Sequence, residues 1–321
     1  MKTRTETSTN VIHFDGRVLF LSEDPTLIEN QLSGHDLTLD QALPLRNDVS
    51  TDEITPANIC YYYDEKLGEF PYVGLRCGDR LPIQKGNVKA GGFQVTVAGR
   101  RYGKGSSREA SPFAEQSAGI KLVIAESFER IYRQNCRNRG ILTSNDFGLI
   151  DRIRRGEGIP LEEFTKGEDE LTAELIRRGG LFKLSEARQK GWRPKQSAPT
   201  QRPMTYPEKV IARARGGNES VSPGESIFIK ADWRYAHDYI TAMAQTFLEQ
   251  ATGGQYSLHE PQGILCFTDH LTFLHHSMPA EKKAIGLLDV AQYMVLQQKH
   301  FADKHRSEEH TSELQSPCTI S

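Results

Sequence analysis

The sequence has few cysteines, and their arrangement does not suggest a disulfide framework or a zinc site. The five cysteines among the 321 residues are Cys60, Cys77, Cys136, Cys266 and Cys318. They are scattered along the chain, and no Cys-x-x-Cys pair occurs. Disulfide-stabilised small folds and zinc modules need paired or closely spaced cysteines. We therefore expect most of these thiols to be single buried side chains.

Long apolar runs and a strong net charge are also missing. No apolar stretch approaches the ~20 residues that a membrane-spanning helix needs, and the polar N-terminus, MKTRTE, lacks the apolar core of a signal peptide. We therefore expect a cytoplasmic protein with no membrane partner. The formal net charge of −2 gives no reason to expect nucleic acid as a partner. A chain of 321 residues is long enough for two domains.

The most distinctive stretch is a glycine-rich turn between a predicted strand and a predicted helix. The strand is residues 93–97, FQVTV, and the turn is residues 103–109, GKGSSRE. Glycines and the free N–H groups of a helix start can bind an anion closely. Arg108 could hold a carboxylate through two parallel hydrogen bonds, and a serine beside it could lose its proton more easily than a free serine. Alternatively, Ser106 and Glu109 fit a helix capping box, and the two roles can coexist.

Strand and helix patterns alternate along the chain, which predicts an α/β fold. A proline-containing stretch, residues 187–203, reads as a linker between two domains. Further strands are predicted at residues 17–21, 121–125, 181–184, 226–232 and 264–268. Further helices are predicted from residue 23 to 34, 127 to 140, 168 to 178, 205 onward, 238 to 251 and 284 to 301.

Three ordered motifs resemble the swivel domain of the aconitase and 3-isopropylmalate dehydratase superfamily. They are residues 47–56 (NDVSTDEITP), 102–109 (YGKGSSRE) and 126–135 (ESFERIYRQN). The resemblance covers roughly residues 17 to 185. It implies a swivel-type domain with a central sheet and flanking helices, and a hydro-lyase that moves water across a carbon–carbon bond of a hydroxy-di- or tricarboxylate. Such an acid, for example 3-isopropylmalate or a citrate-like acid, is the expected small-molecule partner.

The resemblance also assigns roles to residues of this part of the chain. It implies that Ser106 is the base and that Ser107 and Arg108 hold a substrate carboxylate. Asp52 would belong to the polar network behind them. Arg76, in a long aromatic-rich connection, is a candidate for substrate recognition, and an ordinary surface arginine is the alternative.

A second, partial match runs from about residue 205 to 302 and resembles the start of the catalytic large subunit of the same superfamily. Asp269 and His270 match its Asp-His-Leu motif, which implies a proton-delivering role for this pair. Two residues just past a strand also occupy the position where open α/β sheets bind ligands, and a histidine can titrate near neutral pH.

Family members use a [4Fe–4S] cluster held by one isolated cysteine and a Cys-x-x-Cys pair. None of the five cysteines of this chain matches that pattern. The sequence therefore predicts no metal ligands of its own, and the cluster ligands are expected in the part of a full-length protein that this chain lacks.

These patterns predict four segments. Residues 1–186 form the swivel-like domain, 187–204 a linker, and 205–305 an incomplete α/β/α catalytic domain. Residues 306–321 include RSEEHTSELQS, which resembles the translation of a DNA-sequencing adapter, and are expected to be an artefact. Two functions remain open: a truncated dehydratase, inactive alone, or a non-catalytic carboxylate-binding or regulatory protein that kept the swivel domain.

Overall fold

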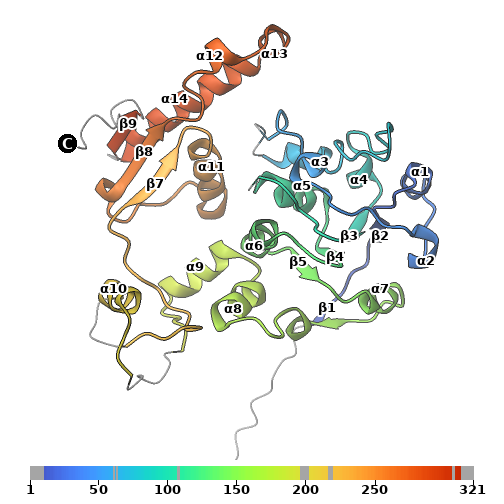
Figure 1. Cartoon of the computed structure of the whole chain (residues 1–321), viewed down its shortest axis with the longest axis horizontal. Coiled ribbons are helices and arrows are strands. Elements are labelled where there is room, and N and C mark those ends of the chain that lie inside the picture. Colours follow the sequence, from blue (N-terminus) through green and yellow to red (C-terminus); the bar gives the residue numbers. More distant parts are fainter. Residues whose placement is uncertain are drawn as a thin grey trace, which may run out of the picture. The chain divides into compact units, whose positions relative to one another are not determined.

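The computed structural model describes residues 11–60, 62, 64–106, 109–195, 202–215, 220–305 and 308–311. The chain divides into two compact units. Unit 1 comprises Met1–Gln196 with Gly224–Ser226, and unit 2 comprises Ser197–Pro223 with Ile227–Ser321. Each unit contains a parallel sheet with helices, so the α/β class is confirmed (Figure 1). Among the described residues, no helix combines the length and the apolar character needed to cross a membrane.

Unit 1 is built on a four-stranded parallel sheet with the strand order β2-β3-β4-β5. Its strands are β2 (Arg17–Phe20), β3 (Phe93–Ala98), β4 (Leu122–Ala125) and β5 (Leu142–Ser144). The main helices are α1 (Pro25–Leu32), α2 (Leu39–Ala42), α3 (Thr51–Ile54), α4 (Asn87–Ala90), α5 (Ala110–Ala118), α6 (Arg130–Arg139), α7 (Gly148–Arg154), α8 (Glu170–Arg178) and α9 (Leu181–Gln189). The smaller elements are 3₁₀ helices η1 (Glu65–Glu69) and η2 (Leu161–Phe164), and an antiparallel pair, β1 (Val11–Ile12) with β6 (Ile159–Pro160).

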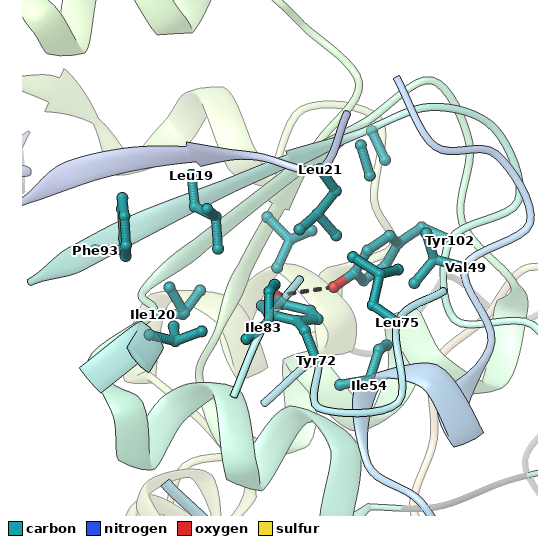
Figure 2. Close-up of a cluster of buried hydrophobic side chains, with 14 of the residues drawn as sticks. Leu19, Leu21, Val49, Ile54, Tyr72, Leu75, Ile83, Phe93, Tyr102 and Ile120 are labelled. Carbon is teal, nitrogen blue, oxygen red and sulfur yellow. Dashed lines mark hydrogen bonds between the residues drawn. The ribbon is translucent and has the colours of Figure 1, made fainter. Parts of the chain in front are cut away.

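Both faces of this sheet are buried, which explains why its strands are almost entirely apolar. Side chains alternate between the faces, so Leu19 belongs to one core and Phe20 to the other. The first core, part of which is drawn in Figure 2, includes residues from α1, α4, α5 and α6. The second includes residues from α2, α7, η2 and α8. Since successive parallel strands add in one direction, right-handed crossovers place α5 and α6 on the same face.

Unit 2 contains a second parallel sheet, ordered β7-β8-β9. Its strands are β7 (Arg234–His237), β8 (Ile264–Thr268) and β9 (Glu308–Thr311). Its helices are α10 (Tyr206–Ala214), α11 (Thr241–Thr252), η3 (Pro261–Gly263), α12 (Leu274–Ser277), α13 (Ala280–Ala284) and α14 (Leu287–His305). Strand β9 lies in the segment that the sequence analysis set aside as an adapter remnant, and its backbone pairs with β8.

Two predicted strands are wrong. Residues 181–184 open helix α9, in which Leu184 and Ala187 are buried three positions apart. Residues 226–232 form no strand, and the strand of this region is β7, a few residues later. The predicted linker begins within α9, and its residues 196–201 lie outside the described part of the chain. Thr51 and Asp52 of the first motif begin the short helix α3.

Candidate functional site

The glycine turn follows β3 at the carboxyl end of the parallel sheet, where open α/β folds bind ligands. The turn lies between the other two motifs. The N–H groups of Gly103 and Lys104 both donate to the carbonyl oxygen of Val49, at 2.8 and 3.1 Å. On the other side, Tyr102 N–H donates to Ser127 O, and Glu129 N–H donates to Tyr102 O, both at 2.9 Å. The three motifs that the sequence analysis singled out are therefore adjacent in space.

The first motif also contacts the turn through a side chain. Thr51 Oγ1 donates to the carbonyl oxygen of Ser106 at 3.2 Å, and Thr51 N–H donates to Lys104 O at 2.7 Å. Helix α3 is held in place by a capping box between Ser50 and Glu53. Thr51 therefore holds the first motif against the glycine turn through one backbone and one side-chain hydrogen bond.

Two residues beside the turn have an uncommon backbone conformation. Asp48 and Arg101 both have a positive φ of 56°, which is uncommon for residues with a side chain. Arg101, which immediately precedes the second motif, forms ion pairs with Asp48 of the first motif at 3.1 Å and with Glu129 of the third at 3.0 Å. Such conformations cost of order 1–3 kcal/mol each and persist where surrounding contacts impose them, often at functional sites.

A cavity of about 1050 Å³ adjoins the turn. Residues of the turn and of helices α3, α6 and α8 line it. They are Thr51, Gly103, Gly105, Ser106, Phe128, Glu129, Arg130, Ile131, Tyr132, Arg133, Gln134, Asn135, Arg137, Glu168, Asp169 and Thr172. Ser106 is exposed at this cavity, as expected of a residue that reaches a ligand.

The arginines of α6 make this cavity suited to an anion. Arg137 pairs with Glu168, and Arg133 lies 4.0 Å from the same carboxylate. Arg130, in the first turn of α6, is exposed, and its side chain makes no hydrogen bond or ion pair with any residue that the structure describes. Sequence reasoning missed Arg130, although its position at a helix start within the third motif was a usable signal.

Ser106 does not form the capping box with Glu109 that was the alternative to an anion site. Helix α5 begins at Ala110, its N-cap residue is Glu109, and no side chain caps it. Ser127, where the predicted helix 127–140 begins, accepts a hydrogen bond from Arg101 N–H, and the N-cap residue of α6 is Glu129. Ser106 therefore has no capping role at the start of α5.

The other predicted residues of unit 1 lie in different places. Ser107 and Arg108 lie outside the described residues. Asp52 is exposed in α3, and Arg76 is exposed in the loop before Cys77. Neither is among the described residues that line the cavity. The structure thus brings Ser106 to the cavity, while the roles of Asp52 and Arg76 stay predictions.

In unit 2, the predicted pair Asp269 and His270 follows β8, beside the end of β7. His270 Nδ1 lies 2.5 Å from Asp269 Oδ1, a contact that orients the imidazole. Buried Asp238, which follows β7, accepts the backbone N–H groups of His270 and Leu271 at 3.2 and 3.1 Å. The His237 and His270 rings stack at 3.8 Å, and burial, followed by the nearby His270, lowers the pKa of His237.

These side chains could hold a metal ion by distance alone. One ligand atom from each of His237, Asp238, Asp269 and His270 lies within 4.8 Å of the others. The two imidazole rings are almost parallel, with an interplanar angle of 8°. Ring nitrogens bind a metal in the plane of the ring, so the stack would have to open before both could bind one ion.

The cysteines of the described residues do not fit an iron–sulfur cluster. Cys60, Cys77, Cys136 and Cys266 are all buried. The Cys60 thiol donates to the carbonyl oxygens of Thr55 and Pro56, and the Cys77 thiol donates to that of Ser22. Three cysteine ligands in one place are needed to hold such a cluster. No group of three or more metal-ligating side chains within the described residues contains a cysteine.

Gly103 can be tested as the residue that allows the turn. Its φ is +82°, and an added Cβ would lie 2.2 Å from Cγ of Tyr132. Gly86 has the matching φ of +83° with no atom within 4 Å of such a Cβ. Replacing either glycine by alanine should lower the free energy of unfolding by roughly 1–2 kcal/mol, because a residue with a side chain is strained in the left-handed conformation. Gly103→Ala should cost about 1–3 kcal/mol more, because it overpacks the site. Chemical unfolding of both variants measures this, and equal losses would contradict it.

Comparisons with known proteins agree with these motifs. Residues 82–145 match the family described as the aconitase C-terminal domain. The isopropylmalate/citramalate isomerase small subunit of Methanocaldococcus jannaschii is 33% identical over 151 residues, which are 42% of this chain and 86% of that protein. The 3-isopropylmalate dehydratase small subunit of Desulfovibrio desulfuricans is 36% identical over 125 residues, 39% of this chain and 72% of that protein. A solved structure of 3-isopropylmalate dehydratase from M. jannaschii covers 45% of this chain and 90% of its own, with 26% identity and a TM-score of 0.33.

Proposed function

We propose that this chain, which belongs to the aconitase superfamily, contributes the substrate-holding domain of a hydro-lyase. Its substrate would be a hydroxy-di- or tricarboxylate of the 3-isopropylmalate or citrate type. The relatives are named small subunits of an isomerase or a dehydratase. That name supports a protein partner for this chain as well, and the [4Fe–4S] cluster would be held outside the described residues, whose cysteines are unsuited to it.

The observation that carries this proposal is the cavity at the carboxyl end of the sheet. Exposed Ser106 and exposed Arg130 both line it. A substrate with several carboxylates needs several cationic or N–H contacts, and a guanidinium that has no described protein partner is available for one of them. The amides at the start of α6 add partial positive charge on the same side.

The proposed chemistry assigns one task to each group. Ser106 would remove the proton next to a substrate carboxylate, and nearby N–H donors and positive charge would favour its ionised form. Ser107 and Arg108 would hold that carboxylate, and Arg130 would bind a second one. Asp52 and Arg76 remain predicted supporting residues. Within unit 2, Asp269 would orient His270 as a proton donor.

We also propose that residues 1–186 are the swivel-like domain, 187–204 a linker, and 205–305 the start of the catalytic domain. The motif coverage supports the first of these, and the Asp-His pair past β8 supports the last. Limited proteolysis with first cuts between residues 187 and 204 would agree with this division, and first cuts within β2 to β5 would contradict it.

Binding of 3-isopropylmalate to the intact chain tests the role of Arg130. A hydrogen bond to a charged group contributes about 1.5–3 kcal/mol. Arg130→Gln should therefore weaken binding about 10- to 100-fold, as measured by titration calorimetry. Arg213, an exposed helical arginine of unit 2, provides the matched control, and Arg213→Gln should bind like the wild type. Equal affinities for wild type and Arg130→Gln would remove Arg130 from the site.

A non-catalytic carboxylate-binding or regulatory protein is the alternative function, and the described cysteines, which are all buried, are compatible with it. The two functions differ in one measurement. The chain would be combined with a cluster-bearing large subunit of a relative, and formation of the unsaturated acid would be followed. Turnover supports the hydro-lyase. Binding of 3-isopropylmalate without turnover in any such combination supports the alternative.

A further inference from the structure

A carboxyl group without a described cationic partner is buried beneath the glycine turn. Glu115, on α5, is fully buried. The partners of its two oxygens among the described residues are three tyrosine hydroxyls: Tyr72 at 2.6 Å and Tyr102 at 2.7 Å on Oε1, and Tyr132 on Oε2. Burying an ionised carboxylate is costly, and here only neutral hydroxyls offset that cost. Such a group is rarely placed in a core without a specific role.

Three of these oxygens form a closed triangle. Its corners are Glu115 Oε1, the Tyr72 hydroxyl and the Tyr102 hydroxyl, and its sides are 2.6, 2.7 and 3.0 Å. Each side of the triangle needs one hydrogen to form a hydrogen bond. The two tyrosine hydroxyls supply two hydrogens, and a protonated Glu115 carboxyl supplies the third. Burial raises the pKa of Glu115, against the opposing effect of its tyrosine hydrogen bonds. Hydrogen counting and burial therefore both favour a neutral Glu115 over an ionised one.

Two of the three tyrosines belong to the turn or lie against it. Tyr102 immediately precedes Gly103 and is bonded to the third motif through its own N–H and C=O groups. The Tyr132 ring lies against the α-carbon of Gly103, and the Tyr102 and Tyr132 rings meet edge to face with centroids 5.1 Å apart. Figure 2 shows the hydrogen bond between Tyr72 and Tyr102 among the apolar side chains of the core.

We propose that Glu115 is the positioning residue of the glycine turn. Its carboxyl group fixes the Tyr102 and Tyr132 hydroxyls at one point, and these tyrosines hold the backbone that carries Ser106 at the cavity. The functional part of this inference rests on the proposed function. Leucine at this position would fill the same space. It has no hydrogen-bond acceptor, however, and could not hold the three hydroxyls together.

Amide hydrogen exchange of the full chain tests the positioning directly. The Gly103 and Lys104 amides are hydrogen-bonded to Val49 O, and the Leu21 and Leu142 amides provide references in the same sheet unit. In Glu115→Gln, the amide nitrogen can donate but cannot accept, so at least one of the three tyrosine hydroxyls loses its acceptor in either orientation of the amide. Exchange at Gly103 and Lys104 should then accelerate about tenfold relative to the references, as expected for one lost hydrogen bond near 1.4 kcal/mol.

Two further variants separate positioning from general stability. Tyr132→Phe keeps the ring against Gly103 and should reproduce the selective acceleration. Gln31→Leu removes a different buried polar group, which bonds the backbone of Phe20, and should accelerate all amides of the unit alike. Uniform acceleration in Glu115→Gln and Tyr132→Phe would overturn the proposal. If the wild type fails to bind 3-isopropylmalate, the proposed function fails, but the exchange result still decides the positioning role.

Discussion

Replacing Ser106 by alanine is expected to lower turnover of the assembled hydro-lyase by about 10²–10⁴-fold, the usual contribution of a positioned base. The Michaelis constant should change little, because the substrate carboxylates are held by other groups. Stability should stay within about 0.5 kcal/mol of the wild type, since the exposed Ser106 side chain does not cap α5. Steady-state kinetics with a cluster-bearing partner subunit and chemical unfolding of the chain measure the two effects.

The control for this prediction is an exposed serine that does not line the cavity. The Ser33 hydroxyl, at the end of α1, donates to Glu29 O, and Ser33→Ala should leave turnover unchanged. A Ser106→Ala variant with near-normal turnover would show that Ser106 is not the base. A stability loss of about 0.5–2 kcal/mol would instead indicate a capping role. The two interpretations that the sequence left open therefore lead to different measurements.

The position of the candidate site could be predicted because it depends on local patterns. A strand, a glycine turn and a helix start in that order place the turn at the carboxyl end of a parallel sheet. The adjacency of the three motifs followed from their resemblance to one domain. The backbone bonds from Gly103 to Val49 and from Tyr102 to Ser127 are consistent with both arguments.

The Glu115 cluster could not be predicted, because its members are far apart in the sequence. Glu115 is separated by 43 residues from Tyr72, by 13 from Tyr102 and by 17 from Tyr132. In a helix, a glutamate is normally taken as a solvent-exposed position. Only the crossover that packs α5 and α6 on one face of the sheet, with the Tyr72 segment, brings these side chains together.

The two wrong strand predictions have local causes. Residues 181–184, LFKL, fit both a strand alternation and one helical turn, and short apolar runs do not distinguish the two. The packing of Leu184 and Ala187 selects the helix. Strand β7 has the sequence RYAH, whose polar ends give no apolar strand pattern. The more apolar run at residues 227–229 led to the prediction of a strand over residues 226–232.

The largest effect on stability is expected for Glu115→Leu. The leucine fills similar space but leaves the Tyr72, Tyr102 and Tyr132 hydroxyls without their common acceptor. A buried hydroxyl that loses its partner costs roughly 1–3 kcal/mol. Tyr72 keeps Thr96 as a partner at 2.9 Å, so the loss should be several kcal/mol and less than the full sum. Chemical unfolding measures it, with Gln31→Leu as the comparison for a single buried polar side chain.

This loss should also depend on pH in a defined direction. Burial raises the pKa of Glu115 in the folded protein above the ordinary value of a glutamate side chain. A raised folded-state pKa contributes stability that is fully present below the unfolded-state pKa and is lost as pH rises through the folded-state value. The stability advantage of the wild type over Glu115→Leu and over Glu115→Gln should therefore be larger at pH 5 than at pH 8. An advantage that stays constant or grows with pH would mean that Glu115 is ionised in the folded protein. The cluster would then be a buried carboxylate held by three donors, and the hydrogen-bonded triangle would lack its third hydrogen.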